Sequence, residues 1–426
     1  MDRVPPSDKI RKEIDAILNG NNREDEENLV SRMLFLGAQK LAQEALEQEV
    51  TDYLGREHYQ RRQKDEEHLG YRNGYRQKGL DTAEGRIHLQ VPQVRDSSEP
   101  YQSRLMGFLR GNSDVLERLA LEMYTRGLST RDIEEAFQEA TGDMLLSRTA
   151  VSTITGQLWA DYQAFCERDL SCFDVEYLFL DGVYESLRHI AGLKEGVLVA
   201  WAICRDGSKV LLHMALGSKE SYSAWQEFIR NMQSRGLQTP VLVATDGAPG
   251  LVRAVEEAWP QSLRQRCLAH KIRNVIDKVP DHAKAEVKAM VHSAYYAPNR
   301  AVGEMVAEDL LKRYQDLYPA AMKSFLDDLE ACWAYLRCPV VHHKRVRTTN
   351  LLERAFVEQK RRTKIIPRFW TEKSCLKLVF ATLWQASARW HSVRMSEFEQ
   401  QQLLQLRREL GLLPPPAAGQ VMKHAA

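Results

Sequence analysis

The chain has 426 residues, of which 44% are hydrophobic and 27% charged, as in ordinary globular proteins of two or three domains. Its formal net charge of +1 excludes a uniformly basic protein, so binding to a polyanion requires a local basic surface. The sequence has neither an apolar run of membrane-spanning length nor a signal-peptide core, and its seven cysteines are scattered, so we expect a cytoplasmic protein with reduced thiols.

The first elements expected are a helix within residues 23–60 and a small β unit after it. The helix is indicated by apolar residues at helical spacing, namely Leu29, Met33, Leu34, Leu41, Leu46 and Val50. Asn73-Gly74 is a hairpin-type turn signal, and Ile87, Leu89 and Val91 alternate as in a strand. The β unit is basic, which favours either DNA contact or a solvated hairpin, through Arg72, Arg76, Lys78, Arg86 and Arg95.

Residues 112–162 predict three short helices. The first covers about residues 114–126 and is ended by Gly127, while Ser129 and Ser147 can cap the second and third. Arg148 and Ser152 lie at the leading end of the third helix. A tri-helical unit whose last helix begins with polar and basic residues is typical of a helix-turn-helix, with a plain helical bundle as the alternative.

From Asp174 the sequence predicts buried strands. They cover residues 175–184, 196–204, 209–217 and 240–247, with a short fifth strand within 263–270. Helices are expected after the third, fourth and fifth strands, the first of them within 218–236 with Ser218 at its start. The order βββαβαβα predicts a mixed sheet flanked by helices, with the first and fourth strands as parallel neighbours at its centre.

Asp181 closes the first of these strands and Asp246 closes the fourth, each in an Asp-Gly step. If the two strands are parallel neighbours, both carboxylates lie at the same edge of the sheet, where ligands tend to bind. The pair is therefore a candidate metal site. The alternative for each residue is ordinary turn chemistry after a strand.

A basic segment, residues 344–373, holds ten Lys and Arg against three Glu and reads as a helix. Glu358 has Arg354, Arg361 and Arg362 at helical neighbour positions, but Glu353 has no cation there. Glu353 therefore needs a partner from elsewhere, which a metal held by Asp181 and Asp246 would supply; the alternatives are a tertiary Arg or exposure to water. Three carboxylates suit Mg²⁺ or Mn²⁺ in two-metal phosphoryl transfer. The candidate phosphate-binding cations, or otherwise a solvated helix face, are Arg354, Lys360, Arg361, Arg362 and Lys364.

At residues 52–373 the chain resembles the Mutator-type DDE transposases of bacterial insertion sequences. The matching stretches are "GYRNGYR", "TAEGRIHLQVPQVRD", "FLDGVY", "ATDGAPGL", "RCLAHKIRNV" and "RTTNLLERAFVEQKRRTK". The resemblance implies an RNase H-like catalytic domain with Asp181, Asp246 and Glu353 as its DDE triad. It also implies that the helical residues 281–340 are an insertion between the second Asp and the Glu.

The resemblance further includes a Cys-x-x-His pair, Cys267 and His270. It implies that His270 touches the scissile DNA or helps to build the active site; zinc binding and plain packing are the alternatives. A second metal-binding pair is not convincing in spacing, although Cys332, Cys338, His342 and His343 exist. Trp333 is similar to an insertion-domain Trp that can stack on an unpaired base, and a core Trp is the alternative.

These expectations divide the chain into five parts, one of which, the catalytic core, is made of two segments. The parts are an N-terminal helical and β region (1–100), an HTH-like domain (101–170), the catalytic core (171–280 and 341–395), the helical insertion (281–340) and a tail (396–426). The expected function is a transposase that binds terminal inverted repeats and target DNA as a dimer or higher oligomer, associated with the bacterial nucleoid. It would hydrolyse a phosphodiester and transfer the resulting 3′-OH. A silent DNA-binding repressor and a nuclease without strand transfer are the alternatives.

Overall fold

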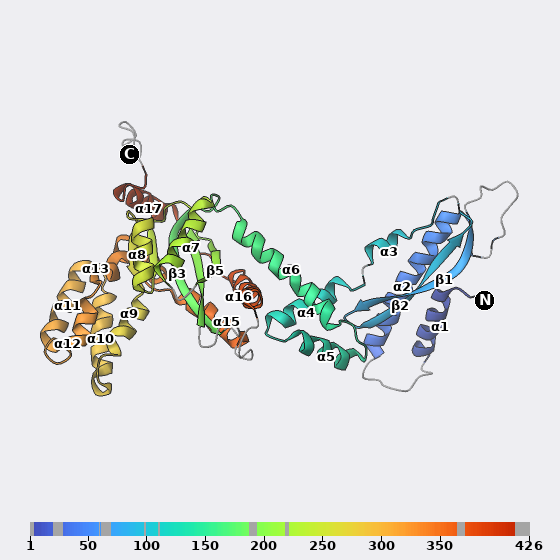
Figure 1. Ribbon diagram of the computed structural model, residues 1–426, viewed down its shortest axis with the longest axis horizontal. Coiled ribbons are helices and arrows are strands. Elements are labelled where there is room, and N and C mark those ends of the chain that lie inside the picture. Colours follow the sequence, from blue (N-terminus) through green and yellow to red (C-terminus); the bar gives the residue numbers. More distant parts are fainter. Residues whose placement is uncertain are drawn as a thin grey trace. The chain divides into compact units, whose positions relative to one another are not determined.

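The computed structural model describes residues 4–19, 29–58, 60, 70–97, 99–109, 111–186, 194–217, 221–363 and 371–413. Its contacts divide the chain into two compact units, Met1–Gln157 and Leu158–Ala426. The elements of both are labelled in Figure 1. None of the described helices is long and apolar enough to cross a membrane.

The first unit begins with helices α1 (Pro6–Leu18) and α2 (Leu29–Leu54), followed by the antiparallel strands β1 (Tyr71–Thr82) and β2 (Gly85–Arg95). The predicted helix and strand are confirmed, and α2 packs on β2 through Leu46, Ile87 and Leu89. The hairpin turn was predicted at Asn73-Gly74, and this prediction is wrong. Gly74, with φ of 77°, lies inside β1 where the register shifts, because a glycine in the left-handed region suits a bulge as well as a turn. The strands instead turn between Thr82 and Gly85.

Helices α3 (Arg104–Phe108), α4 (Asp114–Thr125), α5 (Thr130–Thr141) and α6 (Arg148–Glu167) follow. The predicted caps are present. Ser129 forms a capping box with Asp132, and the Ser147 hydroxyl accepts a hydrogen bond from the Ala150 amide. Helices α4, α5 and α6 share a small core that contains Leu116, Ile133 and Val151.

The second unit is built on a mixed sheet whose described strands are β3 (Val175–Ser186), β4 (Lys194–Cys204), β5 (Lys209–Gly217), β6 (Leu242–Thr245) and β7 (Leu263–Arg266). Their order is β5-β4-β3-β6-β7. Strand β6 is parallel to both β3 and β7, whereas β3, β4 and β5 form an antiparallel meander. The predicted order, and the central parallel pair of first and fourth strands, are confirmed.

One detail of the prediction is wrong, because Asp181 does not close its strand. Strand β3 continues to Ser186 along β4, which is longer than β6. The pairing of β3 with β6, however, ends at Leu180 and Thr245. Asp181 and Asp246 are therefore the next residue on each strand, and the two carboxylates still lie at the same edge.

Helices cover both faces of this sheet (Figure 1). On one face, α7 (Tyr222–Ser234) and α8 (Pro249–Ala258) pack on alternate strand residues such as Leu178 and Leu180. The N-cap of α7 is Ser221 rather than Ser218, which lies outside the described residues. On the other face lie α15 (Asn350–Thr363) and α16 (Glu372–Ser387), with α16 packed on β5 and on α15. Helix α17 (Glu397–Glu409) contacts the start of β3, where Arg407 donates to Glu176 and to the Val175 carbonyl.

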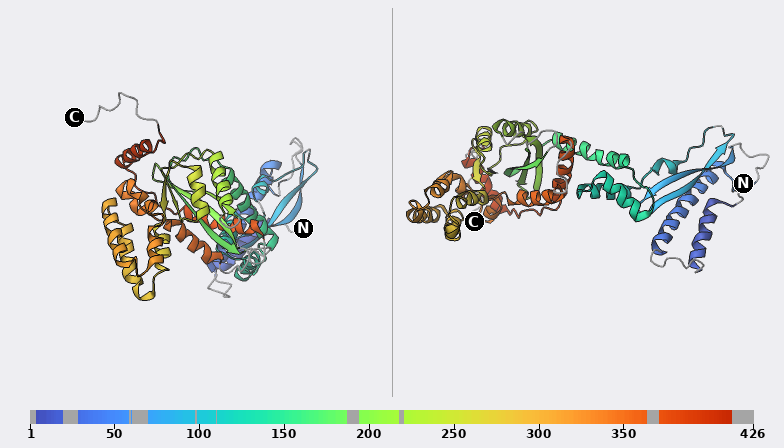
Figure 2. Two further views of the ribbon diagram at one scale, coloured as in Figure 1. Left: turned by 60° about the vertical axis from the view of Figure 1, so that its left-hand side comes forward. Right: turned by 60° about the horizontal axis from the view of Figure 1, so that its bottom comes forward.

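Between β7 and α15 the described chain is helical, as predicted. The elements are α9 (Leu268–Ile276), η2 (Asp281–Ala283), α10 (Lys284–Tyr295), α11 (Arg300–Tyr314), α12 (Pro319–Leu326), α13 (Leu329–Trp333), η3 (Ala334–Arg337), η4 (Val340–His342) and α14 (His343–Val346). Helices α10 to α13 form a bundle of their own beside the sheet, which Figure 2 shows from two further sides. We call α10 to α13 the helical block.

Candidate active site at the edge of the central sheet

Two aspartates stand where the parallel pairing of β3 and β6 ends. Asp181 is 6% exposed, and its Oδ1 accepts a hydrogen bond of 2.8 Å from the Gly182 amide. Asp246 Oδ1 accepts a bond of 2.9 Å from the Ala248 amide. Gly247 between them has φ of 84°, and the Arg266 guanidinium fills the space that a Cβ would need. The loop after β6 therefore requires glycine, and it fixes the direction in which Asp246 leaves the sheet.

The third carboxylate comes from the first turn of α15. The Glu353 amide donates to the Thr349 carbonyl, and its Oε1 lies 3.4 Å from His270 Nε2 on α9. This Oε1 is buried and has no hydrogen bond within the described part of the chain. Glu353 therefore has the tertiary partner that its helix does not provide, but the contact to His270 leaves the oxygen unsatisfied.

The charges of the four predicted catalytic residues interact, as the pKa values of Asp181 and His270 show. Burial raises the pKa of Asp181 to about 7; His270 opposes this rise, and the negative charges of Asp246 and Glu353 add to it. A hydrogen bond with Cys267 raises the pKa of His270 to about 9, although burial lowers it; the charges of Cys267, Asp181 and Glu353 also raise it. Asp181 and Glu353 thus both interact with the His270 imidazolium, and Asp246 adds a further negative charge that acts on Asp181, so like charges meet at this site.

Cys267 ties the segments of this site together. It is fully buried, and its Sγ accepts hydrogen bonds of 3.4 Å from both the amide and the hydroxyl of Thr349. Its own amide donates to the Thr245 carbonyl at the end of β6. Burial raises the pKa of the Cys267 thiol, but His270 and the hydrogen bond from Thr349 together outweigh it, so the pKa is lowered. The sequence analysis did not assign a role to Thr349. Its position in the "RTTN" stretch, one of those that carry the family resemblance, could have indicated one.

A soft-metal alternative also has a geometric basis. Cys267, His270 and Glu353 each offer a ligand atom, and these atoms lie within 4.8 Å of one another. The other predicted metal-binding candidates are engaged elsewhere: His342 Nδ1 is 2.7 Å from the Tyr177 hydroxyl, and His343 Nε2 is 2.9 Å from the Cys338 carbonyl. Across the described ranges they form no cluster of three ligands with Cys332.

The cations predicted on α15 differ in their surroundings. Arg354, Lys360 and Arg361 are exposed, whereas Arg362 is half-buried and donates to Gln385 Oε1 at 3.3 Å. Arg362 therefore links α15 to α16. Lys364 lies outside the described residues.

The cations predicted in the first unit are also of two kinds. Arg76 and Ser152 are exposed, and their contact with DNA stays a prediction. Arg148 is 54% exposed but lies 2.7 Å from Glu134. Arg72 is half-buried and donates to the Thr51 hydroxyl at 2.8 Å, so its guanidinium joins β1 to α2.

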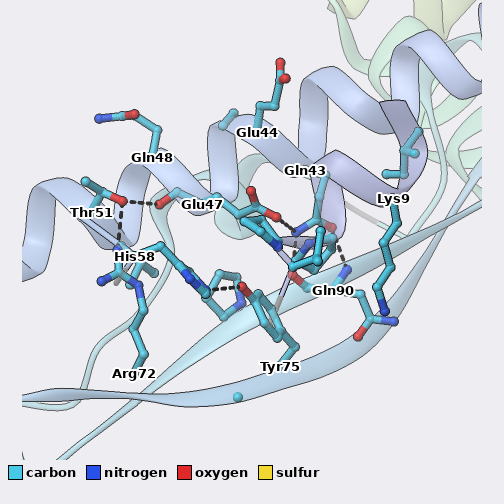
Figure 3. A pocket seen from close by; sticks show the side chains of 18 of the residues that line it. Lys9, Gln43, Glu44, Glu47, Gln48, Thr51, His58, Arg72, Tyr75 and Gln90 are labelled. Atoms are coloured by element: carbon cyan, nitrogen blue, oxygen red, sulfur yellow. Dashed lines mark hydrogen bonds between the residues drawn. The ribbon is translucent and has the colours of Figure 1, made fainter. Parts of the chain in front are cut away.

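Arg72 also lines the cavity shown in Figure 3, which has a volume of about 1150 Å³ between α1, α2 and the hairpin. Glu47 lies on another wall and accepts hydrogen bonds from Ser7. His58 Nε2 is 3.1 Å from the Tyr75 hydroxyl. The walls thus carry charges of both signs, and the cavity does not have the character of a polyanion site.

For Trp333 the structure favours the packing alternative. Its side chain is 4% exposed, and its Nε1 donates a hydrogen bond of 3.1 Å to the Ala294 carbonyl. A Cβ added to Gly303 would lie 2.9 Å from its ring. Trp333 is therefore a core residue of the helical block, with no ring face open to a base in this structure.

Comparison with known proteins agrees with this organisation. The model of the Mutator family of transposases matches residues 14–393. The transposase for insertion sequence element ISRM5 of Rhizobium meliloti is 32% identical over 373 residues, which cover 86% of this chain and 91% of that protein. The transposase for IS406 of Burkholderia multivorans is 31% identical and covers 82% of this chain and 89% of its own length.

A third relative is the transposase for IS256 in transposon Tn4001 of Staphylococcus aureus. It is 28% identical over 382 residues, which cover 89% of this chain and 94% of that protein. The matched region includes both aspartates, the Cys-x-x-His pair and the helix that carries Glu353. The chain therefore belongs to the Mutator family of transposases.

Proposed function

We propose that this transposase cuts and joins DNA with Asp181, Asp246 and Glu353 as the carboxylates of a divalent-metal site. The observation that carries the proposal is that Asp181 and Asp246 follow the paired ends of β3 and β6, close enough to Glu353 for its charge to act on Asp181, while a buried Glu353 oxygen has no hydrogen bond among the described residues. The oxygens of the three carboxylates do not lie within 4.8 Å of one another in the described structure. Like charges at this density destabilise the fold unless a cation compensates them. If the three carboxylates served only the stability of the fold, their mutual repulsion would be a cost without a benefit.

The residues present fit Mg²⁺ or Mn²⁺. All three side chains offer carboxylate oxygens, which hard divalent cations prefer, and the Glu353 Oε1 is available to a ligand. A bound pair of such ions would activate the attacking oxygen and stabilise the leaving oxygen of a phosphodiester. Asp181, Asp246 and Glu353 would hold them.

The other residues of the site have separate roles in this proposal. His270, charged at neutral pH, compensates part of the negative charge and can face a phosphate oxygen once Glu353 is engaged. Cys267 and Thr349 hold the start of α15 against the end of β6, and so position Glu353. Neither hydrolysis nor transfer of a 3′-OH then requires a protein nucleophile.

The order of the sheet supports an RNase H-like catalytic core, with the helical block as an insertion within it. We assign binding of terminal inverted repeats to the first unit, where α4 to α6 and the β1–β2 hairpin present exposed basic and polar residues such as Arg76 and Ser152. Because two element ends must be processed together, the active form is proposed to be at least a dimer.

The test uses purified protein and a labelled duplex that carries an end of the element, with Mg²⁺ or with EDTA. Wild type should nick and join the duplex in the presence of Mg²⁺ but not in EDTA. Glu353→Gln should bind the DNA without cutting it. Glu358→Gln is the matched control on the same helix and should keep activity. Cutting without joined product would indicate a nuclease, and binding without cutting by wild type would indicate a repressor. Equal activity of Glu353→Gln would exclude Glu353 from the metal site.

A further inference from the structure

A small basic cleft lies beside the carboxylates, within the second unit. It has a volume of about 220 Å³ and is bounded by β4, β5, Tyr296 and the chain around the start of α15. Five cations line it: Lys209, Lys344, Arg345, Arg347 and Arg354. In the described part of the chain, no lining residue is Asp or Glu. Only Arg354 among these five was a predicted phosphate contact.

The cations of this cleft are not compensated by carboxylates. Several exposed arginines of the second unit lie beside a carboxylate; Arg253 is 2.9 Å from Glu257, and Arg300 is 2.7 Å from Glu304. The five cleft cations have no ion pair with any carboxylate of the described residues. Burial lowers the pKa of Lys209, and the charge of Arg345 lowers it further, so the positive charges are close enough to repel one another. Such a concentration of like charge indicates an anionic ligand.

A buried donor gives the second sign of a ligand. Trp201 lines the cleft and is 2% exposed, yet its indole N–H has no acceptor among the described residues. A buried N–H without an acceptor costs free energy, which an anionic oxygen that reached it from the cleft would offset. Its role cannot be base stacking, because the Trp201 ring already stacks on Phe179 with centroids 4.0 Å apart.

The other aromatic residue in the cleft is also unavailable to a base. Tyr296 has the Arg347 guanidinium 4.1 Å from its centroid and stacks on His292 at 4.0 Å. Because the Tyr296 ring already contacts Arg347 and His292, the cleft offers cations and a hydrogen-bond donor rather than a stacking surface. The chemistry favours a phosphate group over a base.

The cleft opens on the face of the sheet that carries the carboxylates. Asp181 pairs with Val199, and Phe179 pairs with Trp201, so the two pairs are two residues apart on the same face. Two residues of a strand span about 7 Å. On α15, Arg354 of the cleft directly follows Glu353. A strand bound at the carboxylates would thus pass the cleft with its neighbouring phosphates.

We propose that this cleft binds the phosphodiester backbone of a DNA strand immediately next to the bond that the carboxylates process. The inference rests on the proposed function and adds a subsite to it. Lys209, Arg345 and Arg347 would then hold the strand in register, so that one particular phosphate is presented to the carboxylates.

The experiment compares Lys209→Ala/Arg345→Ala with a matched control, Lys288→Ala/Lys312→Ala, whose two lysines are exposed on the helical block. Binding of the full chain to the labelled end duplex is measured by anisotropy over a range of salt. Loss of two phosphate contacts should reduce the slope of log K against log salt by about 1.4–1.8 and weaken binding roughly tenfold, with no change in the control. Lys209→Arg/Arg345→Lys should recover most of the affinity, which excludes a folding defect.

Neutral methylphosphonates, placed one at a time around the cleaved bond, locate the contact. In wild type, one or two positions adjacent to that bond should weaken binding, and the alanine variant should be insensitive to the same positions. Two outcomes would overturn the subsite and leave the proposed function intact, provided that wild type still cuts. In the first, the effects of the methylphosphonates and of the alanine substitutions on binding add up; in the second, the alanine variant has the same salt slope as wild type. Binding of inorganic phosphate that is lost in the variant without an effect on DNA would reassign the cleft to free phosphate. Failure of wild type to bind or cut DNA would overturn both.

Discussion

Replacing Asp181 by Asn should stabilise the metal-free second unit while it abolishes cutting. The side chain is 6% exposed, and its pKa is raised to about 7, first by burial and then by its carboxylate neighbours. Asn keeps an oxygen for the bond from the Gly182 amide, which is 2.8 Å long, and it removes the buried charge. The substitution therefore removes the cost of burying this charge, and with it the repulsion from Asp246 and Glu353, without a cavity or a lost hydrogen bond.

The magnitude follows from linkage. The ordinary pKa of Asp is 3.8, so a folded value of about 7 is a rise of about 3, which corresponds to at most about 4 kcal/mol. Because the folded pKa is raised, the unfolded chain loses its proton first, and the wild type loses stability as pH rises from about 4 to about 7. The difference between Asp181→Asn and wild type should be small below about pH 4 and reach its plateau above about pH 7.

Tryptophan fluorescence can follow this unit alone. All eight tryptophans lie between residues 159 and 390, in the second unit. Denaturant unfolding in EDTA should give a higher midpoint for Asp181→Asn than for wild type at about pH 8. Added Mg²⁺ should raise the wild-type midpoint and leave that of the variant nearly unchanged, because binding to the folded state stabilises it.

Asp316→Asn, an exposed carboxylate after α11, is the control and should shift the midpoint little at any pH. A destabilised Asp181→Asn at about pH 8 would refute the argument that the buried charge of Asp181 destabilises the metal-free fold. So would a stabilisation of equal size at about pH 4, since the charge would then not be its origin.

Three further substitutions test the frame of the site. Gly247→Ala should cost at least about 1–2 kcal/mol in denaturant midpoint and impair cutting, since φ is 84° and the added Cβ would lie 0.8 Å from a guanidinium nitrogen. Arg407→Met should cost about 2 kcal/mol in the same assay, because the fully buried Glu176 accepts from Arg407 at 2.9 Å and would keep only Arg205 as its cation. Trp333→Phe should lower the midpoint by about 1–2 kcal/mol and keep cutting within a few fold of wild type; a folded but inactive variant would instead favour base stacking.

Local pattern was sufficient to predict the sheet of the second unit. Strands β3, β4 and β5 are nearly continuous apolar runs with short connections, and β6 and β7 each follow a helix. These signals depend only on neighbouring residues, so the order of the strands and the edge that holds Asp181 and Asp246 could be predicted. The end of β3 could not, because it depends on how far β4 extends beside it.

Contacts between distant segments were beyond sequence patterns. The absence of a cation near Glu353 on its own helix predicted a partner from elsewhere, a metal or otherwise an Arg or water, but it did not predict the contact with His270. The pattern did not reveal that Cys267 accepts from Thr349, 82 residues later in the chain. The sequence pattern also predicted that Arg72 contacts DNA or solvent. It did not reveal that Arg72 donates a hydrogen bond to Thr51 and so joins β1 to α2.

The position of Glu353 does not depend on the rigidity of the helical block that precedes it in sequence. The amide of Cys267 donates to the Thr245 carbonyl at 2.8 Å, and the amide of Leu268 donates to the Arg347 carbonyl at 3.0 Å. These bonds tie the segment before α15 directly to the sheet edge, on either side of the buried thiol. Changes in length within the helical block should therefore be compatible with a competent carboxylate cluster. Changes at Cys267 or Thr349 should separate Glu353 from the two aspartates, although neither residue carries the charge that the reaction needs.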